Sequence, residues 1–212
     1  MSLGADIKET YQDVGVEYTI LRQSGNISGE YLDYSPNSQV TKPFVREYFL
    51  EADIPYDTQA DSGNVIQFSD GRRFLIMNKT PEMFEDEIIS FSCVLYKTNI
   101  VAVIMRPVEV RDEHSLEITT SWGTVTSGEH ALLVDKLFGA ELNQRSDIGQ
   151  LAIEGDECYI PASLGVQVLD RLIVSGEYAG GIMSGEMYKV EVIKKRDFDN
   201  VWVCNLVEDT RG

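Results

Sequence analysis

Apolar and polar residues alternate over short stretches through the first hundred residues of the chain. The run at 16–21, Val-Glu-Tyr-Thr-Ile-Leu, is rich in β-branched and aromatic side chains and ends at the turn-forming residues 23–26. Alternation with a period of two, bounded by turn residues, is typical of β-strands. The same reasoning predicts four further strands, at 44–52, 65–68, 73–77 and 88–96.

A hairpin signal lies between the third and fourth of these strands. Asp70 and Gly71 separate two apolar runs, and both residue types tolerate the positive φ angles that a tight hairpin turn requires. The first hundred residues therefore predict a compact antiparallel meander.

The pattern weakens after Asn99. Residues 100–105 predict another strand, whereas 107–128 are charged and rich in threonine. Residues 129–142 carry apolar side chains at helical spacing, which predicts a short helix with one apolar face. That face consists of Ala131, Leu133, Val134, Leu137 and Phe138. Strands return in the C-terminal part, at 157–160, 171–174, 187–193 and 201–207.

The C-terminal strands repeat a pattern of the N-terminal half. A glycine followed by an aromatic-centred strand occurs at 71–76 and again at 185–190, and each copy continues through a charged turn containing Phe. Each then enters a strand carrying Cys-x-Leu, at Cys93 and at Cys204. The spacing from glycine to cysteine differs by three residues, which one loop difference absorbs. The repeat favours a structural duplication, against the alternative of chance similarity between two β segments.

These patterns predict a mostly β protein with two tandem small antiparallel β-barrel or sandwich domains and a short helix between them. We expect an N-terminal β-barrel domain at 1–105, a connecting segment with the helix at 106–150, and a C-terminal β domain at 151–212 that repeats the first. A chain of 212 residues is long enough for two small cores.

Net charge limits the partners of such a protein. The chain carries 35 acidic and 18 basic residues, which gives a formal charge of −17. An acidic surface repels phosphates and anionic lipids, so we expect neither tight nucleic-acid binding nor a membrane partner. No run of about 18 apolar residues occurs, and residues 1–10 lack the apolar core of a signal peptide. These features predict a protein made and kept in the cytoplasm, or assembled there into something larger.

The search for chemistry yields no catalytic, cofactor-binding or metal-binding constellation. Cys93, Cys158 and Cys204 are widely spaced without a CxxC pair, which favours buried free thiols over disulfides or zinc. The histidines, His114 and His130, stand in charged surroundings without a second histidine at ligand spacing. We therefore predict no enzyme and no cofactor, while a hydrolase remains an alternative because triads can assemble in space.

Other candidate serines, glycines and carboxylates have ordinary explanations. Ser92, beside Cys93, and Ser115 have no recognisable base in the sequence. The glycine-rich segment 176–185 is followed by a strand rather than a helix, which predicts a flexible loop and not a phosphate cradle. The acidic pairs at 86–87 and 208–209 lack the spacing of a calcium loop.

A series of segments in the first hundred residues carries a resemblance to a known family. The series runs from Tyr-Thr-Ile-Leu-Arg at 18–22, through Tyr-Leu-Asp-Tyr at 31–34 and the strand 46–52, to the segment 62–74. In this order the segments resemble the neck proteins of tailed bacteriophages. The resemblance covers chiefly residues 14–99, with a weaker similarity at 155–209. Neck proteins include head-completion, stopper and head-tail joining proteins, which are small β-barrels with long loops that form rings between portal and tail.

The resemblance implies a structural virion protein of the neck or tail region, assembled in the host cytoplasm. It implies a homo-oligomeric ring of twelve or six subunits that contacts portal or adaptor and tail proteins. DNA would pass through its lumen without sticking, because acidic walls repel phosphates. Long loops at 34–42 and 179–184 would gate the lumen or clamp a neighbour, and neighbouring subunits would cover exposed strand edges. The alternatives are a collar, tail or baseplate component, or a β-rich module that binds, for example, carbohydrate.

Overall fold

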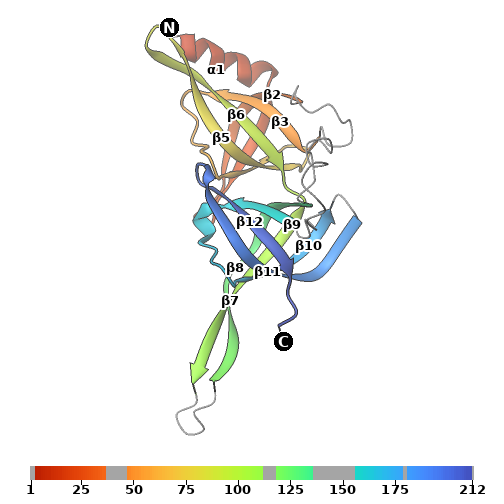
Figure 1. The fold of residues 1–212 in the computed structure, drawn as a ribbon. Helices are drawn as coiled ribbons and strands as arrows, with labels where there is room; N and C mark the ends of the chain where they lie inside the picture. Colours follow the sequence, from red (N-terminus) through yellow and green to blue (C-terminus); the bar gives the residue numbers. More distant parts are fainter. Residues whose placement is uncertain (1–2, 37–46, 112–117, 136–155, 179–180, 212) are drawn as a thin grey trace, which may run out of the picture. The chain divides into compact units, whose positions relative to one another are not determined.

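A computed structural model describes residues 3–36, 47–111, 118–135, 156–178 and 181–211 of the chain (Figure 1). These residues form one α-helix, twelve β-strands and the short 3-10 helix η2 (Ala162–Leu164). The strands close into two separate six-stranded antiparallel barrels. The predicted mostly β fold with two small barrels is therefore confirmed.

The first barrel consists of strands β1 to β6, with α1 packed against it, and the second consists of β7 to β12. The bounds are α1 (Leu3–Val14), β1 (Val16–Leu21), β2 (Ile27–Pro36), β3 (Phe49–Pro55), β4 (Val65–Phe68), β5 (Arg73–Phe84), β6 (Glu87–Lys97), β7 (Ile100–Arg111), β8 (Ile118–Asp135), β9 (Asp156–Pro161), β10 (Arg171–Tyr178), β11 (Gly181–Phe198) and β12 (Val201–Glu208).

The two barrels have the same strand order. The order around the first barrel is β1-β2-β3-β6-β5-β4, and that around the second is β7-β8-β9-β12-β11-β10. The sequence repeat falls on equivalent strands, because its aromatic-centred segment lies on β5 and β11 and its cysteine lies on β6 and β12. The repeat observed in the sequence thus corresponds to a repeated topology.

Alternating side chains fill the interior of the first barrel. Tyr18, Ile20 and Ile66 are almost completely buried, and Phe68 packs against Phe74 with ring centroids 4.7 Å apart. A hairpin turn lies between these two aromatic strands at the predicted place, but its conformation differs from the predicted one. Gly71 has φ 88° and its amide donates to the carbonyl of Phe68 over 2.9 Å, whereas Asp70 does not have a positive φ. Burial of apolar side chains at about 25 cal/mol per Å² is the main stabilising contribution to such a core.

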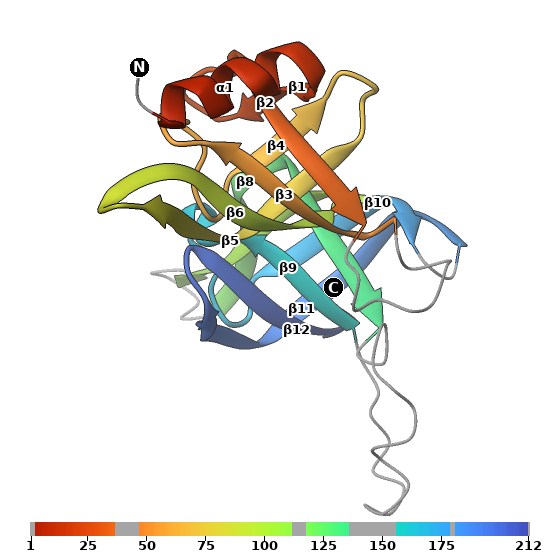
Figure 2. The same ribbon diagram turned by 90° about the horizontal axis from the view of Figure 1, so that it is seen from above.

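Helix α1 lies against β2, β3 and β6 of the first barrel (Figure 2). An ion pair between Lys8 Nζ and Asp57 Oδ2, 2.5 Å apart, ties the helix to the segment after β3. Gly15 follows the helix, and a Cβ atom there would lie 2.7 Å from the carbonyl oxygen of Leu32 on β2. The chain can turn tightly from α1 into β1 because residue 15 has no side chain.

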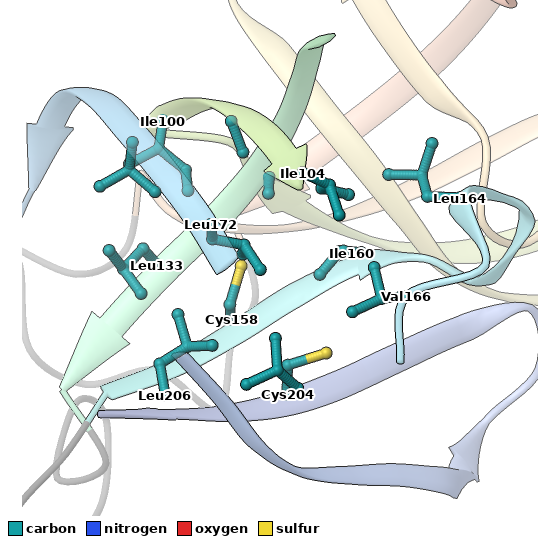
Figure 3. Close-up of a cluster of buried hydrophobic side chains, with 14 residues drawn as sticks. Ile100, Ile104, Leu133, Cys158, Ile160, Leu164, Val166, Leu172, Cys204 and Leu206 are labelled. Atoms are coloured by element: carbon teal, nitrogen blue, oxygen red, sulfur yellow. The ribbon is translucent and has the colours of Figure 1, made fainter. Parts of the chain in front are cut away.

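The second barrel has its own core (Figure 3). Ile100, Ile104, Leu133, Leu172 and Leu206 are each exposed by 2% or less. The thiols of Cys158 and Cys204 lie in the same cluster. Both barrels therefore bury a continuous apolar interior of their own.

The prediction of a helix at 129–142 is wrong for the residues that the structure describes. Residues 129–135 belong to strand β8, and residues 136–142 lie outside the described part of the chain. Residues 131–134 are all buried, with Ala131 and Leu133 in the barrel core. A short continuous apolar run fits a fully buried strand as well as a helix, and hydrogen bonding to β7 and β9 decides for the strand. Among the described residues, the α-helix lies near the N-terminus, at Leu3–Val14. The spacing of four residues between Ile7 and Tyr11 is compatible with one face of a helix.

The domain boundaries also differ from those expected. The chain divides into one compact unit of Met1–Thr98 with Phe198–Val201 and a second of Asn99–Asp197 with Trp202–Gly212. The region 106–150, expected to be a connecting segment, supplies the second half of β7 and all of β8. Without those two strands the second barrel could not close, which is why its boundary moves from 105 to 98.

Most predicted strands coincide with observed ones, although several run further. The predictions at 16–21 and 65–68 match β1 and β4, whereas β5 and β11 extend well beyond 73–77 and 187–193. Strand β3 begins at Phe49, and residues 44–46 lie outside the described part. The alternation of apolar and polar residues does not predict most of β8, because its threonine-rich half forms a ribbon with little apolar burial.

Candidate interaction surface

A two-stranded ribbon extends from the second barrel (Figure 1). Strand β7 pairs with β10 only as far as Met105, and β8 pairs with β9 only from Leu132 onward. Pairing of β7 with β8 nevertheless continues to Arg111 and Ile118. We call residues 106–111 and 118–124 the β7–β8 arm. Six residues of β7 carry the arm about 20 Å past the last barrel pair.

Arg106 holds the first strand of the arm at its root. Its Nε and Nη2 atoms donate to the two carboxylate oxygens of Asp170 over 2.9 and 2.8 Å, and Nη2 also donates to the carbonyl of Gly165. The Asp170 side chain is 1% exposed and also accepts the amide of Gln167. A bidentate arginine-carboxylate pair fixes orientation as well as distance, so the root of the arm has a defined direction.

Trp122 holds the second strand of the arm. The guanidinium carbon of Arg171 lies 3.8 Å from the centroid of its ring, and that of Arg211 lies at 4.9 Å. Both arginines donate to the buried carboxylate of Asp209, and these hydrogen bonds keep the pKa of Asp209 well below its ordinary value. Stacking of a cation on an aromatic ring adds to stability when the pair is partly desolvated.

The first barrel extends a second ribbon, formed by β5 and β6 (Figure 2). Strand β3 pairs with β6 only to Ser90, and beyond it Met83 pairs with Ile88 and Phe84 with Glu87. We call residues 82–88 the β5–β6 tip. Glu85 and Asp86 form its turn, with φ angles of 49° and 73°. Three apolar side chains at the tip are exposed, Met83 by 58%, Phe84 by 53% and Ile88 by 41%.

The root of this second ribbon is also anchored. The pairing of β5 with β6 shifts register between Ile76 and Asn78, and the Asn78 side chain accepts the amide of Val94 over 2.7 Å. Lys79 Nζ donates to the carbonyl of Ala60 and lies 4.2 Å from the centroid of the Phe91 ring. A bulge bends its strand and increases the local twist.

The described candidate nucleophiles and bases lie on β-strands. Ser92 and Cys93 are on β6, and no histidine occurs in Met1–Thr98. His130 is a half-buried residue of β8, opposite Val101 of β7. His114 and Ser115 lie outside the described residues. Among the residues that the structure describes, no three His, Cys, Asp or Glu side chains are placed to hold a metal ion.

The three thiols are buried and free, as the sequence predicts. Desolvation raises the pKa of Cys93 and of Cys204 to about 12, and it raises that of Cys158 well above its ordinary value. Thiols with such pKa values are poor nucleophiles near neutral pH. They pack as small apolar side chains.

The glycine-rich segment is mostly paired strand rather than a loop. Gly176 pairs with Met183 and Tyr178 with Gly181, which leaves only residues 179–180 outside the described part. Of the proposed gating loops, 181–184 therefore belongs to β11, and 37–42 lies outside the described residues. Gly176 has φ 139°, and a Cβ there would lie 2.3 Å from the carbonyl oxygen of Asn99. Residue 176 is a glycine because the backbones of β10 and the segment before β7 lie too close together for a side chain.

A polar cavity of about 240 Å³ lies between α1, β2 and the segment after β3. The carboxylate of Glu30 in its wall accepts hydrogen bonds from Tyr18 Oη over 2.6 Å, from Thr58 Oγ1 and from the amide of Gln59 over 3.0 Å. Lys8 and Asp57 are paired with each other. These bonds attach the segment after β3 to the barrel wall and occupy the charged groups of the cavity.

Comparison with protein-family models, with curated proteins and with solved structures finds no match for this chain. Within the described ranges, no helix has the length and apolar character needed to cross a bilayer. The function must therefore be inferred from the two ribbons and from the charge of the surface.

Proposed function

We propose that the protein is a structural virion component of a tailed bacteriophage. It forms a homo-oligomeric ring of twelve or six subunits at the head-tail interface, joins portal or adaptor to tail proteins, and lets DNA pass. The finer position, whether stopper, connector, collar or baseplate, belongs to the same proposal. The resemblance of residues 14–99 to neck proteins motivates this proposal, and the β7–β8 arm is the structural observation that supports it.

The arm is suited to contacts between subunits. A closed barrel leaves no free strand edge, so the barrel walls offer no place for strand addition. Beyond Arg106, in contrast, the described strands pair only with each other, and both outer edges are open. Isolated two-stranded ribbons are marginally stable in water. An arm with an anchored root gains stability when a neighbouring chain covers its edges.

Acidic charge supports the same role. A net charge of −17 repels DNA phosphates, and a wall of that sign does not retain DNA that passes it. The charge also opposes association through unspecific contacts, so a ring of this chain requires specific ones such as the arm. We therefore expect assembly to depend on partner surfaces.

The test is direct observation of the assembly state. We would measure the full chain by mass photometry and electron microscopy, alone and with purified portal ring and tail assemblies, and examine it in the native particle. Rings on the portal or tail support the proposal. Isolated monomers under all these conditions, including in the native particle, would overturn it.

A carbohydrate-binding module is the second candidate, and the tryptophans argue against it. Trp122 is covered by Arg171, and Trp202 is half-buried with Lys195 Nζ 4.2 Å from the centroid of its ring. Neither offers the open aromatic platform that sugar rings stack on. Binding on a glycan array without binding to a portal or tail ring would favour the module.

A further inference from the structure

The β5–β6 tip combines exposed apolar side chains with unpaired negative charge. Single exposed apolar residues are common on proteins, but Met83, Phe84 and Ile88 lie within six residues at the end of a projecting ribbon. The tip also contains Glu82, Glu85, Asp86 and Glu87 and no basic residue. Among the described residues, no ion pair involves these four carboxylates.

The register of the ribbon places apolar groups on both of its faces. Met83 and Ile88 are directly opposite each other and therefore share one face, whereas Phe84, the next residue along β5, points to the other. A flat partner surface could cover only one of these faces. An apolar pocket or slot that surrounds the tip covers both.

The negative charge of the tip indicates which side chains surround the opening of that pocket. Four carboxylates around an apolar centre match a rim of lysine and arginine, because complementary charges at the edge of an interface speed encounter and exclude wrong partners. A second copy of this chain is a poor receptor, since it carries 35 acidic and 18 basic residues. A lipid bilayer is equally poor, because the carboxylates of the tip would have to enter with the apolar groups.

The turn itself indicates that its side chains are needed. Tight hairpin turns with positive φ at both central positions favour Asn-Gly, yet this turn uses Glu85 and Asp86. Non-glycine residues in this conformation cost about 1 kcal/mol or more each. Residues held in such conformations cluster at functional sites such as ligand clamps, which agrees with a binding role for the tip.

We propose that the β5–β6 tip inserts into an apolar pocket, rimmed by lysine and arginine, on a different protein. The partner is thus recognised by the chemistry of its pocket. This inference deepens the proposed function. It rests on that function in one respect only, namely the expectation that the partner is another virion protein.

The experiment uses the full chain in the cells that make it naturally. The substitution Phe84→p-benzoylphenylalanine places a photo-crosslinker at the tip, and Val192→p-benzoylphenylalanine places one at a control position on β11, where Val192 is 46% exposed. After irradiation, mass spectrometry identifies the crosslinked polypeptide and the crosslinked segment. Circular dichroism of each purified variant verifies that it folds.

We expect the Phe84 crosslinker to attach to an apolar segment of a different protein that has lysine or arginine beside it. Adding Met83→Ser with Ile88→Thr lowers the crosslink yield about tenfold, since central apolar anchors carry most of the binding energy. Adding Glu82→Gln with Glu87→Gln lowers it about threefold, as expected for rim charges. Val192→Thr is the matched control and leaves the yield unchanged.

Three results overturn the inference: a crosslink to a second copy of the chain, a crosslink to lipid, or a yield no higher than that of the Val192 control. Sedimentation with virus particles tests the proposed function separately. A crosslinked partner with the expected pocket that is absent from particles would leave the tip inference standing and reject the neck role.

Discussion

Two arginines donate four hydrogen bonds to the carboxylate of Asp209. Arg171 Nε donates over 2.7 Å, while Arg211 donates from Nε, Nη2 and its own amide over 2.8 to 3.0 Å. The Asp209 side chain is fully buried. Together with Trp122, on which both arginines stack, these residues form a cluster. The sequence did not predict this cluster, because its members come from β8, β10 and the C-terminal segment, which lie together only in the folded protein.

The substitution Asp209→Asn tests the cluster. Breaking a buried charge pair from one side costs about 3 kcal/mol, so the unfolding free energy of the second barrel falls by about that amount at pH 7. The pKa of Asp209 is depressed in the fold, so the carboxylate stabilises above its unfolded pKa and the contribution is lost as pH falls below roughly 4. The stability difference between variant and wild type therefore narrows in acid.

Urea denaturation at several pH values measures this difference. Glu208→Gln is the matched control, because Glu208 is the exposed neighbour of Asp209 on the chain. An equal stability of Asp209→Asn and wild type at pH 7 would contradict the structural role given to the carboxylate.

The cysteines give a second prediction at the residue scale. Cys93, Cys158 and Cys204 are buried, and desolvation raises the pKa of each thiol. A thiol reagent such as Ellman's reagent should react with none of them in the native protein at pH 8 and with all three in denaturant, because the thiolate is the reactive form. Rapid labelling of the native protein would show that a thiol is accessible.

At the scale of elements, the two ribbons separate what holds the barrels together from what projects from them. Inside the barrels, buried apolar side chains define the strands, at every second position in β1 and at three of the four positions in β4. In the arm, Thr120, Ser121 and Thr124 are exposed, and neighbouring backbone hydrogen bonds define the strand instead. Periodicity finds the first kind of strand and misses the second, since a ribbon has no buried face to encode.

The turn of the β5–β6 tip gives a prediction at this scale. Replacing Glu85→Asn together with Asp86→Gly relieves the positive φ angles of the turn and should raise the unfolding free energy of the first barrel by about 1 kcal/mol. Thermal denaturation followed by circular dichroism measures the change. Glu82→Gln, in the same ribbon outside the turn, should have little effect. A loss of stability in the double variant would show that the native turn residues are not strained.

For the whole molecule, the common strand order of the two barrels is the main organising feature. Each unit has its own core, and the sequence repeat maps onto equivalent strands. The repeat of glycine, aromatic strand and Cys-x-Leu predicted this duplication, although the predicted boundary at 105 assigned the first half of β7 to the N-terminal barrel and the second half to the connecting segment.

Each barrel should also fold independently. A fragment of residues 1–98 contains α1 and all six strands of the first barrel, so we expect it to give a strand-type circular dichroism spectrum and a cooperative melting transition. Dispersed amide signals in a nuclear magnetic resonance spectrum would give independent support. A spectrum of a random coil would show that the first barrel depends on the rest of the chain.

The β class, most barrel strands, the position of the turn at Asp70-Gly71, the internal repeat and the buried state of the thiols could be predicted from the sequence. All of these depend on residues close together in the chain, whose alternation and turn chemistry are local. That residues 129–135 form a strand, that α1 covers the first barrel and that Asp209 meets two arginines became apparent only in the folded chain. These features depend on which distant segments pair, and pairing follows from closing a barrel around its core, which no local pattern specifies.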